Sequence, residues 1–284
     1  MEDRPRIAFW GTPELTRAYL DALEAAGLSP VVVVTNPDRP KGRGQELAAP
    51  PAKLWALERS IPVLQPEKLD DAFMEDLRRF RPDISAVVAY GSIIPEAAIS
   101  LPPRGTLNVH YSLLPAYRGA SPTESAILAG DTETGCSIQV MVPALDAGPV
   151  IAEERLSIGP DETTPELRAR LTALGARMLA DTIPKHIAGE TAPVPQDDSL
   201  ATRARKIRKE DALLDIENGD PARNYRAYRA YAEWPRVYFF ARKNGTDTRV
   251  IITKAHFENG SFAIDRVLPE GRKEIAYEDF KKNG

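Results

Sequence analysis

Cysteine is almost absent from this sequence, with Cys136 as the only one among 284 residues. An intrachain disulfide is therefore impossible, and a zinc cluster built from thiolates cannot form within one chain. The three histidines, His110, His186 and His256, lie far apart and match none of the close spacings of zinc motifs. These absences favour a reducing, cytoplasmic protein whose chemistry uses no metal.

Long apolar runs are absent as well. No uninterrupted stretch of about 18 apolar residues occurs, and the charged start of the chain lacks the hydrophobic core of a signal peptide. With 43% hydrophobic and 27% charged residues, the composition is that of a soluble globular protein without a membrane partner.

Several nucleotide-binding and hydrolase signatures are also missing. Gly11 follows the first expected strand, but the G-x-G-x-x-G spacing of dinucleotide sites is absent and Pro13 replaces a flexible glycine. The sequence contains neither a P-loop nor a G-x-S-x-G nucleophile elbow. These observations argue against a nicotinamide enzyme and against a serine hydrolase.

The net charge of −4 conceals a difference along the chain. Residues 1–200 carry 19 basic and 28 acidic side chains, whereas residues 201–284 carry 18 and 13. Five basic residues crowd into one short segment, namely Arg203, Arg205, Lys206, Arg208 and Lys209. Such a segment can follow a phosphate backbone by releasing counterions, but a solvated linker has the same composition, so both interpretations stay open.

Short β-rich apolar runs alternate with helical patterns through the first 200 residues. The runs that predict strands are 7–10, 31–35, 62–64, 84–90, 106–110 and 137–142. Helical spacing occurs at 14–26, 51–59, 70–80, 122–129 and 165–188. This alternation predicts an α/β fold with a doubly wound, mainly parallel sheet, whose ligand site lies beyond the carboxyl ends of the strands.

Residues 189–203 are expected to form a linker because proline, glycine and acidic residues dominate them. We therefore expect a catalytic domain over 1–203 and a small β-rich domain over 204–284. The second domain has a helical pattern at 221–231 and strand patterns at 236–242, 249–257, 261–267 and 274–280. Asn-Gly pairs at 244–245 and 259–260 favour hairpin turns, so a small antiparallel sheet or barrel is predicted.

Asn108 and His110 are the side chains that most suggest chemistry. They stand two residues apart at the end of a predicted strand and therefore project to the same face. An amine that attacks a carbonyl carbon builds an oxyanion, which an amide and a protonated imidazole can stabilise. Asp146 could hold the imidazole, or a water that removes the proton. The residue types alone fit a strand-end histidine and a turn aspartate equally well.

The neighbouring segments extend this pattern. Asn-Val-His at 108–110, Ser-Leu-Leu-Pro at 112–115, Tyr-Arg-Gly at 117–119 and Leu-Asp-Ala-Gly at 145–148 resemble the signature of the transferases that use 10-formyltetrahydrofolate. In that family the asparagine, histidine and aspartate form the catalytic group, and the resemblance implies these roles for Asn108, His110 and Asp146. It also implies 10-formyltetrahydrofolate as the formyl donor, with no metal.

The resemblance also extends to the folate pocket of that family. The Ser-Leu-Leu-Pro segment touches the folate, which implies contacts from Ser112, Leu113, Leu114 and Pro115. Residues 89–95 match the loop that lines the pterin pocket, which implies contacts from Tyr90, Gly91, Ser92 and Ile93.

Residues 36–44 (NPDRPKGRG) are similar to the loop that enters the tRNA acceptor stem in the branch of the family that formylates methionyl-tRNA. Arg39, Lys41 and Arg43 are spaced by proline and glycine, so we expect a mobile finger without helix or strand. Residues 206–211 and 234–236 are similar to the C-terminal domain of that branch, an OB-like barrel that helps to bind tRNA. These similarities imply initiator methionyl-tRNA as the partner, with the basic segment 203–209 assisting, no DNA, and a monomer.

Three places depart from the residues usual in that branch: Ala116, residues 121–124 and Pro149. They concern contacts to the acceptor. Formyl transfer to methionyl-tRNA is the leading interpretation, and a nucleotide-linked amino sugar is the alternative acceptor, for which a basic finger would be unnecessary. Glycinamide ribonucleotide is favoured less, and an inactive folate- or RNA-binding module is the alternative from another class.

Overall fold

The computed structural model describes residues 4–41, 46–243 and 246–282. The chain forms two compact units, each made of segments that are distant in sequence. The first comprises residues 1–118, 135–156 and 169–203, and the second comprises 119–134, 157–168 and 204–284. The predicted domain boundary near residue 204 stays a prediction, although residues 119–134 and 157–168 group with the C-terminal part. In the described part of the chain, no helix is long and apolar enough to cross a membrane.

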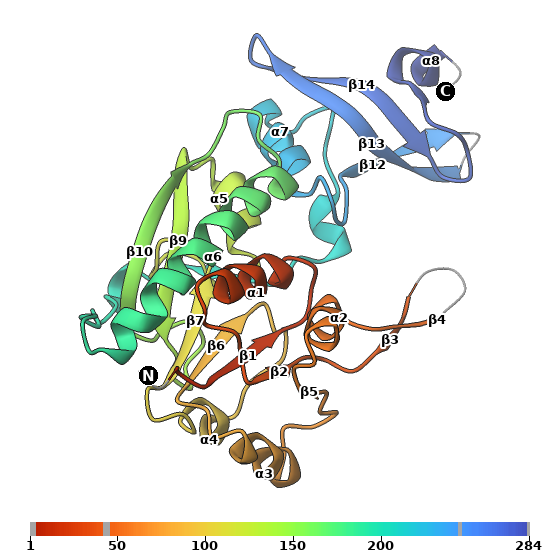
Figure 1. The fold of residues 1–284 in the computed structure, drawn as a ribbon. Coiled ribbons are helices and arrows are strands. Elements are labelled where there is room, and N and C mark those ends of the chain that lie inside the picture. The colour runs from red at the N-terminus through yellow and green to blue at the C-terminus, as the bar shows by residue number, and fades with distance from the viewer. Residues whose placement is uncertain (1–3, 42–45, 244–245, 283–284) are drawn as a thin grey trace. The chain divides into compact units, whose positions relative to one another are not determined.

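A seven-stranded sheet runs through the first unit in the order β10-β9-β7-β6-β1-β2-β5 (Figure 1). Its strands are β1 (Ile7–Gly11), β2 (Val32–Val34), β5 (Val63–Leu64), β6 (Ile84–Val88), β7 (Thr106–His110), β9 (Glu133–Val140) and β10 (Val150–Ser157). The pairs from β5 to β7 are parallel, and β9 is antiparallel to β7. The predicted mainly parallel sheet is confirmed. Strand β10 was not predicted, because it is an edge strand whose middle residues are charged and exposed.

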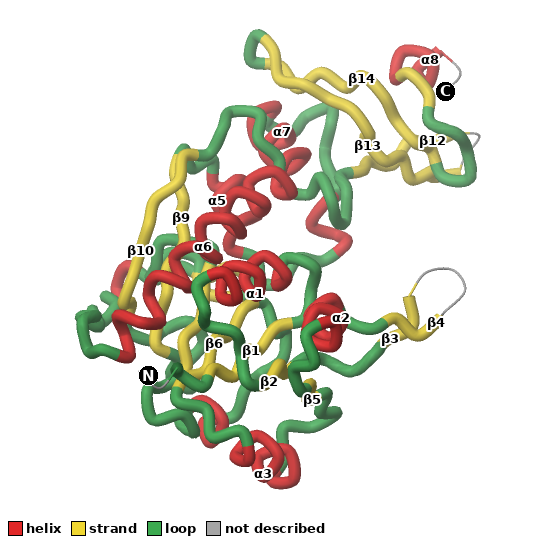
Figure 2. The backbone as a smooth tube through the Cα atoms, in the orientation of Figure 1, coloured by secondary structure: helices red, strands yellow, loops and turns green. Residues whose placement is uncertain are grey.

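Helices cover both faces of this sheet. They are α1 (Thr16–Ala25), α2 (Pro51–Glu58), α3 (Asp71–Arg79), α4 (Glu96–Ile99) and α6 (Thr164–Ile187). Figure 1 shows α1 and α6 on one side of the sheet and α3 and α4 on the other, and Figure 2 shows the helices and strands taking turns along the chain. The doubly wound architecture is therefore confirmed.

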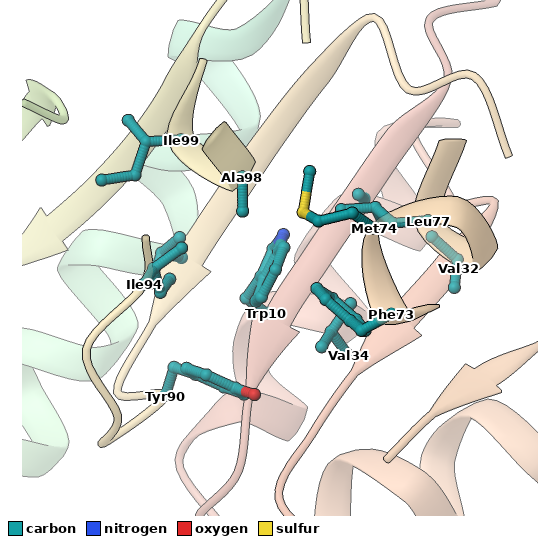
Figure 3. Close-up of a cluster of buried hydrophobic side chains, with 12 residues drawn as sticks. Trp10, Val32, Val34, Phe73, Met74, Leu77, Tyr90, Ile94, Ala98 and Ile99 are labelled. Carbon is teal, nitrogen blue, oxygen red and sulfur yellow. The ribbon is translucent and has the colours of Figure 1, made fainter. Parts of the chain in front are cut away.

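Trp10 lies at the centre of an apolar cluster between the sheet and helices α3 and α4 (Figure 3). Its ring meets Phe73 and Tyr90 edge-on, with centroids 5.5 and 5.3 Å away, and its indole N–H donates to Ser85 Oγ at 3.2 Å. Each such aromatic pair contributes about 0.5 to 1.5 kcal/mol beyond the burial of its area. The cluster fixes the carboxyl ends of β1 and β6, where ligands bind in sheets of this kind.

The β3–β4 hairpin, made of residues 39–41 and 46–48, follows the carboxyl end of β2. Strands β3 (Arg39–Lys41) and β4 (Glu46–Ala48) pair antiparallel, with Arg39 opposite Ala48. The finger expected without strand over residues 36–44 is therefore wrong at 39–41. A two-stranded ribbon has only edge strands, and these tolerate the proline that argued against a strand. Arg43 lies outside the described residues.

The second unit contains a four-stranded antiparallel sheet in the order β12-β13-β14-β15. Its strands are β12 (Tyr238–Lys243), β13 (Thr246–Glu258), β14 (Ser261–Pro269) and β15 (Ile275–Ala276). Asn259 and Gly260 have φ values of 50° and 77° at the tight turn between β13 and β14, as their sequence predicted. The small β-rich C-terminal part is confirmed. The turn expected at 244–245 lies outside the described residues.

The strand predicted at 274–280 is wrong beyond Ala276. Helix α8 (Tyr277–Lys282) begins there, with acidic residues in its first turn and basic residues in its last. Charges in these positions stabilise the helix dipole and outweigh the alternation of the short sequence pattern.

Helix α7 (Pro221–Ala230) explains why distant segments join the second unit. Its buried Arg229 donates to the carbonyl groups of Gly159 and Glu162, each at 3.3 Å. Tyr225 donates to Asp161 Oδ1 at 2.8 Å, and helix α5 (Pro122–Ala129) packs against α7. A buried guanidinium requires such acceptors, so residues 157–168 are held firmly to this helix.

Candidate active site

Asn108 and His110 stand at the carboxyl end of β7. The strand lies between β6 and β9, with Asn108 opposite Gln139 and His110 opposite Ser137. His110 is buried and Asn108 is partly buried. The amide side chain of Asn108 forms no hydrogen bond with the described residues, so its donors are available to a ligand.

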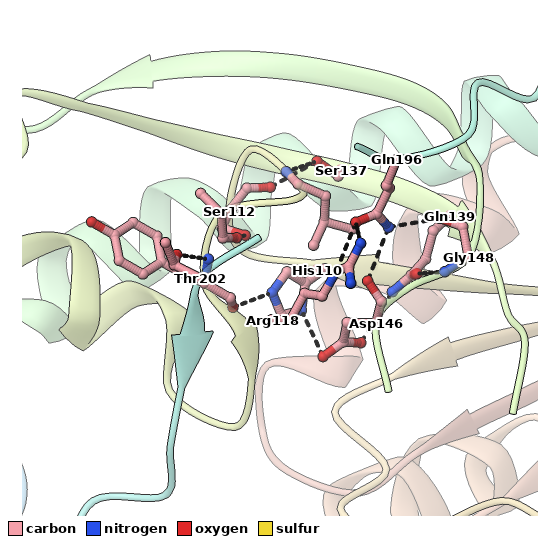
Figure 4. Close-up of polar contacts among 12 residues, drawn as sticks. His110, Ser112, Arg118, Ser137, Gln139, Asp146, Gly148, Gln196 and Thr202 are labelled. Atoms are coloured by element: carbon pink, nitrogen blue, oxygen red, sulfur yellow. Dashed lines mark hydrogen bonds and ion pairs between the residues drawn. The ribbon is translucent and has the colours of Figure 1, made fainter. Parts of the chain in front are cut away.

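The imidazole of His110 lies between a backbone carbonyl and a carboxylate (Figure 4). Its Nε2 is 2.9 Å from the carbonyl oxygen of Tyr117. A carbonyl only accepts, so Nε2 carries a proton, and in the neutral ring the lone pair is on Nδ1. Nδ1 faces Asp146 Oδ2 at 3.7 Å, so a proton that arrives at Nδ1 meets a negative charge. The structure thus brings His110 and Asp146 together, as the resemblance implied.

Asp146 belongs to a turn that two glutamines hold. Its φ of 50° is unusual for a residue with a side chain. Gln139 donates to Asp146 Oδ1 at 3.0 Å and accepts the Gly148 N–H at 3.0 Å. Gln196 donates to the carbonyl groups of Asp146 and Gly148 at 2.9 and 2.7 Å. These bonds fix both the backbone of the turn and the carboxylate that it carries.

The sequence did not point to Gln139, Gln196 or Arg118. Arg118 donates to Gln196 Oε1 from Nε at 2.9 Å and from Nη2 at 2.8 Å, which orients the glutamine amide. Gln139 gave one signal, since it is a polar residue inside the apolar run of β9. Gln196 gave none, because it lies in the segment that was expected to be a linker.

The segment after β7 is bonded mainly to itself and to β9. Ser112 is fully buried, and its hydroxyl donates to the Ala116 carbonyl at 2.6 Å. Ser137 Oγ donates to the Ser112 carbonyl at 2.8 Å and accepts the Leu114 N–H at 3.0 Å. Leu114 is buried too. Among the four expected folate contacts of this segment, Leu113 and Pro115 are therefore the partly exposed ones.

The loop after β6 contains a buried residue, Tyr90, and continues with the exposed residues 91–93. The side chain of Tyr90 lies in the Trp10 cluster, where burial raises its pKa to about 12. Its carbonyl accepts hydrogen bonds from Asn36 at 3.0 Å and from Thr12 at 3.3 Å. Gly91 has a φ of 84°, and residues 91–93 are exposed, with Ile93 95% exposed. A ligand can therefore reach residues 91–93, whereas Tyr90 shapes the loop.

The base of the β3–β4 hairpin is anchored through Asp38. Lys53 donates to both carboxylate oxygens of Asp38 at 2.8 and 2.9 Å, and Gln65 donates at 2.7 Å. These bonds, first from Gln65 and then from Lys53, lower the pKa of Asp38. Arg39 is exposed and lies 3.7 Å from Glu67. The hairpin thus presents a cation from a fixed base.

The five basic residues of segment 203–209 are exposed, and Arg205 forms an ion pair with a residue just beyond the segment. Arg205 bonds Asp211 at 2.5 and 2.7 Å, and this contact lowers the pKa of that carboxyl. Arg203 begins the short strand β11 (Arg203–Ala204), which pairs with β8 (Arg118–Gly119). The other cations of the segment are Lys206, Arg208 and Lys209, and all three are exposed.

Metal-binding side chains do not gather in the described residues. No group of three or more histidine, cysteine, aspartate or glutamate residues in the placed parts of the chain could hold an ion. Cys136 is buried, and burial raises its pKa to about 12, so its thiol is a poor ligand.

Comparisons with known proteins agree with this geometry. The formyl transferase family matches residues 5–183. The methionyl-tRNA formyltransferase of Myxococcus xanthus is 45% identical over 270 residues, which cover 94% of this chain and 84% of the relative. That of Acidithiobacillus ferrooxidans is 49% identical over 217 residues, or 76% of this chain and 69% of the relative.

Solved structures with the same fold are more distant in sequence. HypX from Aquifex aeolicus, in complex with tetrahydrofolic acid, has a TM-score of 0.66 at 15% identity and covers 98% of this chain and 47% of its own. The N-formyltransferase from Helicobacter canadensis, in complex with folinic acid and dTDP-3-aminofucose, has a TM-score of 0.64 at 15% identity, covering 96% of this chain and 98% of its own. At this identity the likeness concerns the fold alone.

Proposed function

The chain belongs to the formyl transferase family, and from this premise we propose that it formylates the free amino group of methionyl-tRNA. The formyl donor is 10-formyltetrahydrofolate, and the product is N-formylmethionyl-tRNA for translation initiation. The observation that carries the proposal is that Asp146 faces His110, which lies two residues from Asn108 on the same face at the carboxyl end of β7.

Asn108, His110 and Asp146 can each take a different role in acyl transfer. A bond forms between the amine nitrogen and the formyl carbon, and the bond from that carbon to the folate nitrogen breaks. The carbonyl oxygen gains negative charge on the way, and the amide N–H of Asn108 can donate to it. The attacking amine must lose a proton, which the His110–Asp146 pair receives, while the departing folate nitrogen gains one.

We place the folate against the exposed tip of the loop after β6 and against the segment after β7. Residues 91–93 and the partly exposed Leu113 and Pro115 support this placement. The backbone groups near Gly91 suit a flat heterocycle, since a residue without a side chain permits close approach.

The Gly91→Val variant tests the folate placement. We expect the affinity for a non-reactive folate analogue to fall about tenfold, because an L side chain at positive φ costs roughly 1 to 2 kcal/mol and shifts the loop. Calorimetry gives the dissociation constant. Gly27→Val is the matched control, because Gly27 has a φ of 74° and open space around it, at the end of α1. Equal affinities in the two variants would move the folate away from this loop.

The β3–β4 hairpin and the basic segment 203–209 support tRNA as the acceptor. Cations contribute most of the non-specific affinity for nucleic acid, and a projecting ribbon can reach a backbone that a closed site cannot. A sugar nucleotide offers too few phosphates to require either feature.

Replacing Arg39, Lys41 and Arg43 together by alanine tests that reasoning. Up to three phosphate contacts disappear, so the slope of log K against log salt should flatten by about 0.7 to 0.9 per contact. Folate affinity should not change. Filter binding of methionyl-tRNA across a salt series measures the slope.

A charge-matched control separates specific contacts from net charge. Arg78, Arg79 and Arg81 are exposed at the end of α3, and their replacement by alanine removes the same charge. We expect the salt slope of this control to match the unmodified protein. If both triple variants flatten the slope equally, the hairpin has no special role in binding.

The acceptor itself is settled by product analysis. The protein is incubated with 10-formyltetrahydrofolate and either charged initiator methionyl-tRNA or a nucleotide-linked amino sugar. We expect formylmethionine after ester hydrolysis, and no formylated sugar. The opposite result would assign the amino sugar as the substrate.

The proposal also covers the oligomeric state, the compartment and the nucleic-acid partner. We propose a monomer that works in the cytoplasm on initiator methionyl-tRNA and does not bind DNA. The single, buried cysteine and the soluble composition support this setting.

A further inference from the structure

Gln139 lies inside the site without belonging to the three residues that the sequence pattern marks. It is 1% exposed on β9, directly opposite Asn108. Because alternate residues of a strand share a face, Gln139 lies on the face that also carries His110 and Ser137. A buried amide in an apolar strand is costly unless both of its ends are bonded.

Both ends of the Gln139 amide are bonded to the turn that carries Asp146. Nε2 donates to Asp146 Oδ1, and Oε1 accepts the Gly148 N–H, each at 3.0 Å (Figure 4). The two partners fix the orientation of the amide. A flipped amide would set oxygen against carboxylate and N–H against N–H.

The backbone of the same turn has further partners. Gln196 bonds the carbonyl groups of Asp146 and Gly148, and these two bonds remain when Gln139 is replaced. The bond from Gln139 to Oδ1 restricts the rotation of the Asp146 carboxylate about its side-chain bonds, and Oδ2 then faces His110 Nδ1 at 3.7 Å.

We propose that Gln139 is a positioning residue for the formyl transfer, acting through Asp146. It holds one carboxylate oxygen so that the other faces the imidazole when the proton leaves the amine. The inference rests on the proposed function, and turnover by the unmodified protein is measured beside every variant. Absence of that turnover would refute the function, whereas the comparison among variants tests Gln139.

Gln139→Met keeps the length of the side chain and removes its donor. Hydrogen bonds to charged groups are strong enough that we expect kcat to fall about 10- to 100-fold. KM for folate and for methionyl-tRNA should stay within about twofold, because Gln139 reaches the substrates only through Asp146.

Gln139→Glu gives a signature that a merely structural role would not give. Near neutral pH the new carboxylate repels Asp146, so kcat should fall at least as far as in the methionine variant. As the pH falls, the new carboxyl gains a proton early, since two adjacent carboxylates tend to share one. Its O–H can then donate to Asp146 Oδ1. The ratio of variant to unmodified kcat should therefore rise as the pH falls, whereas the ratio for Gln139→Met should stay flat.

Thr134→Val is the matched control on the same strand. Thr134 is buried and its hydroxyl has no hydrogen-bond partner, so the change removes a polar group without breaking a bond. We expect kcat to stay unchanged. The proposal is overturned if Gln139→Met keeps kcat within about threefold, or if the glutamate ratio does not depend on pH.

Discussion

Replacing Asn108, His110 or Asp146 singly by alanine should lower kcat for formyl transfer by about a hundred- to a thousandfold, which is the usual cost of losing an oxyanion donor and lies within the range for a group that moves a proton. In the proposed mechanism each residue acts mainly where charge develops and where the proton moves, which is in the transition state. The dissociation constants of folate and tRNA should therefore change little. Single-turnover kinetics at saturating substrate separates the chemical step from binding.

His186→Ala is the control for the histidine variant. His186 lies near the end of α6 and bonds Thr191 and the carbonyl of Arg104, so its loss removes an imidazole without touching β7. We expect an unchanged kcat. The effects of alanine at the three site residues should not add in a triple variant. Where residues act as a unit, the first substitution already removes most of the rate enhancement that they provide together. A single site variant with near-normal kcat would remove that residue from the mechanism.

Gly148→Ala should cost about 3 kcal/mol of unfolding free energy, near the upper end of single substitutions, and should also lower kcat about a hundredfold. A Cβ at this position would lie 1.8 Å from the carbonyl oxygen of Val140. Backbone atoms cannot yield that space, so the turn must move. Its movement breaks the bonds of Gly148 to Gln139 and Gln196 and displaces Asp146. Thermal unfolding and kcat at a temperature where the variant is folded measure the two effects.

Gly189→Ala separates this clash from the ordinary cost of replacing a glycine. Gly189 has a φ of 76°, but a Cβ there would meet nothing within 4 Å. We expect a loss of about 1 kcal/mol from the strained backbone alone and an unchanged kcat. If Gly148→Ala behaved like this control, the tight approach to Val140 would have no bearing on the site.

The sequence predicted those parts of the fold whose conformation depends mainly on the burial of apolar side chains. Strands β1 and β6 are buried on both faces, so their apolar runs follow from burial alone. Strand β10 and helix α8 were not predicted because both are largely exposed. Their conformation depends on a neighbouring strand or on helix-end charges, and neither leaves an apolar pattern.

The residues of the site likewise divide into those with a local sequence pattern and those that depend on distant partners. Asn108 and His110 could be predicted because the periodicity of a strand places them on one face. Asp146 required the resemblance, and Gln139 and Gln196 required the structure. Their bonds join residues that only the folded chain brings together, and no local pattern records a partner at a distance of 50 residues, as between Gln196 and Asp146.

The bonds made by residues 189–203 also determine when the site can exist during synthesis. Gln196 closes on the Asp146 turn and on Arg118, and Thr202 accepts the N–H of Tyr117, 85 residues earlier in the chain. A chain emerging from the ribosome folds its early parts first. Strand β7 and its histidine can therefore be in place before Gln196 bonds the turn that carries Asp146. The site is complete only after residue 202 has emerged, so a chain released early would carry all three of the proposed catalytic side chains and lack the contacts that align them.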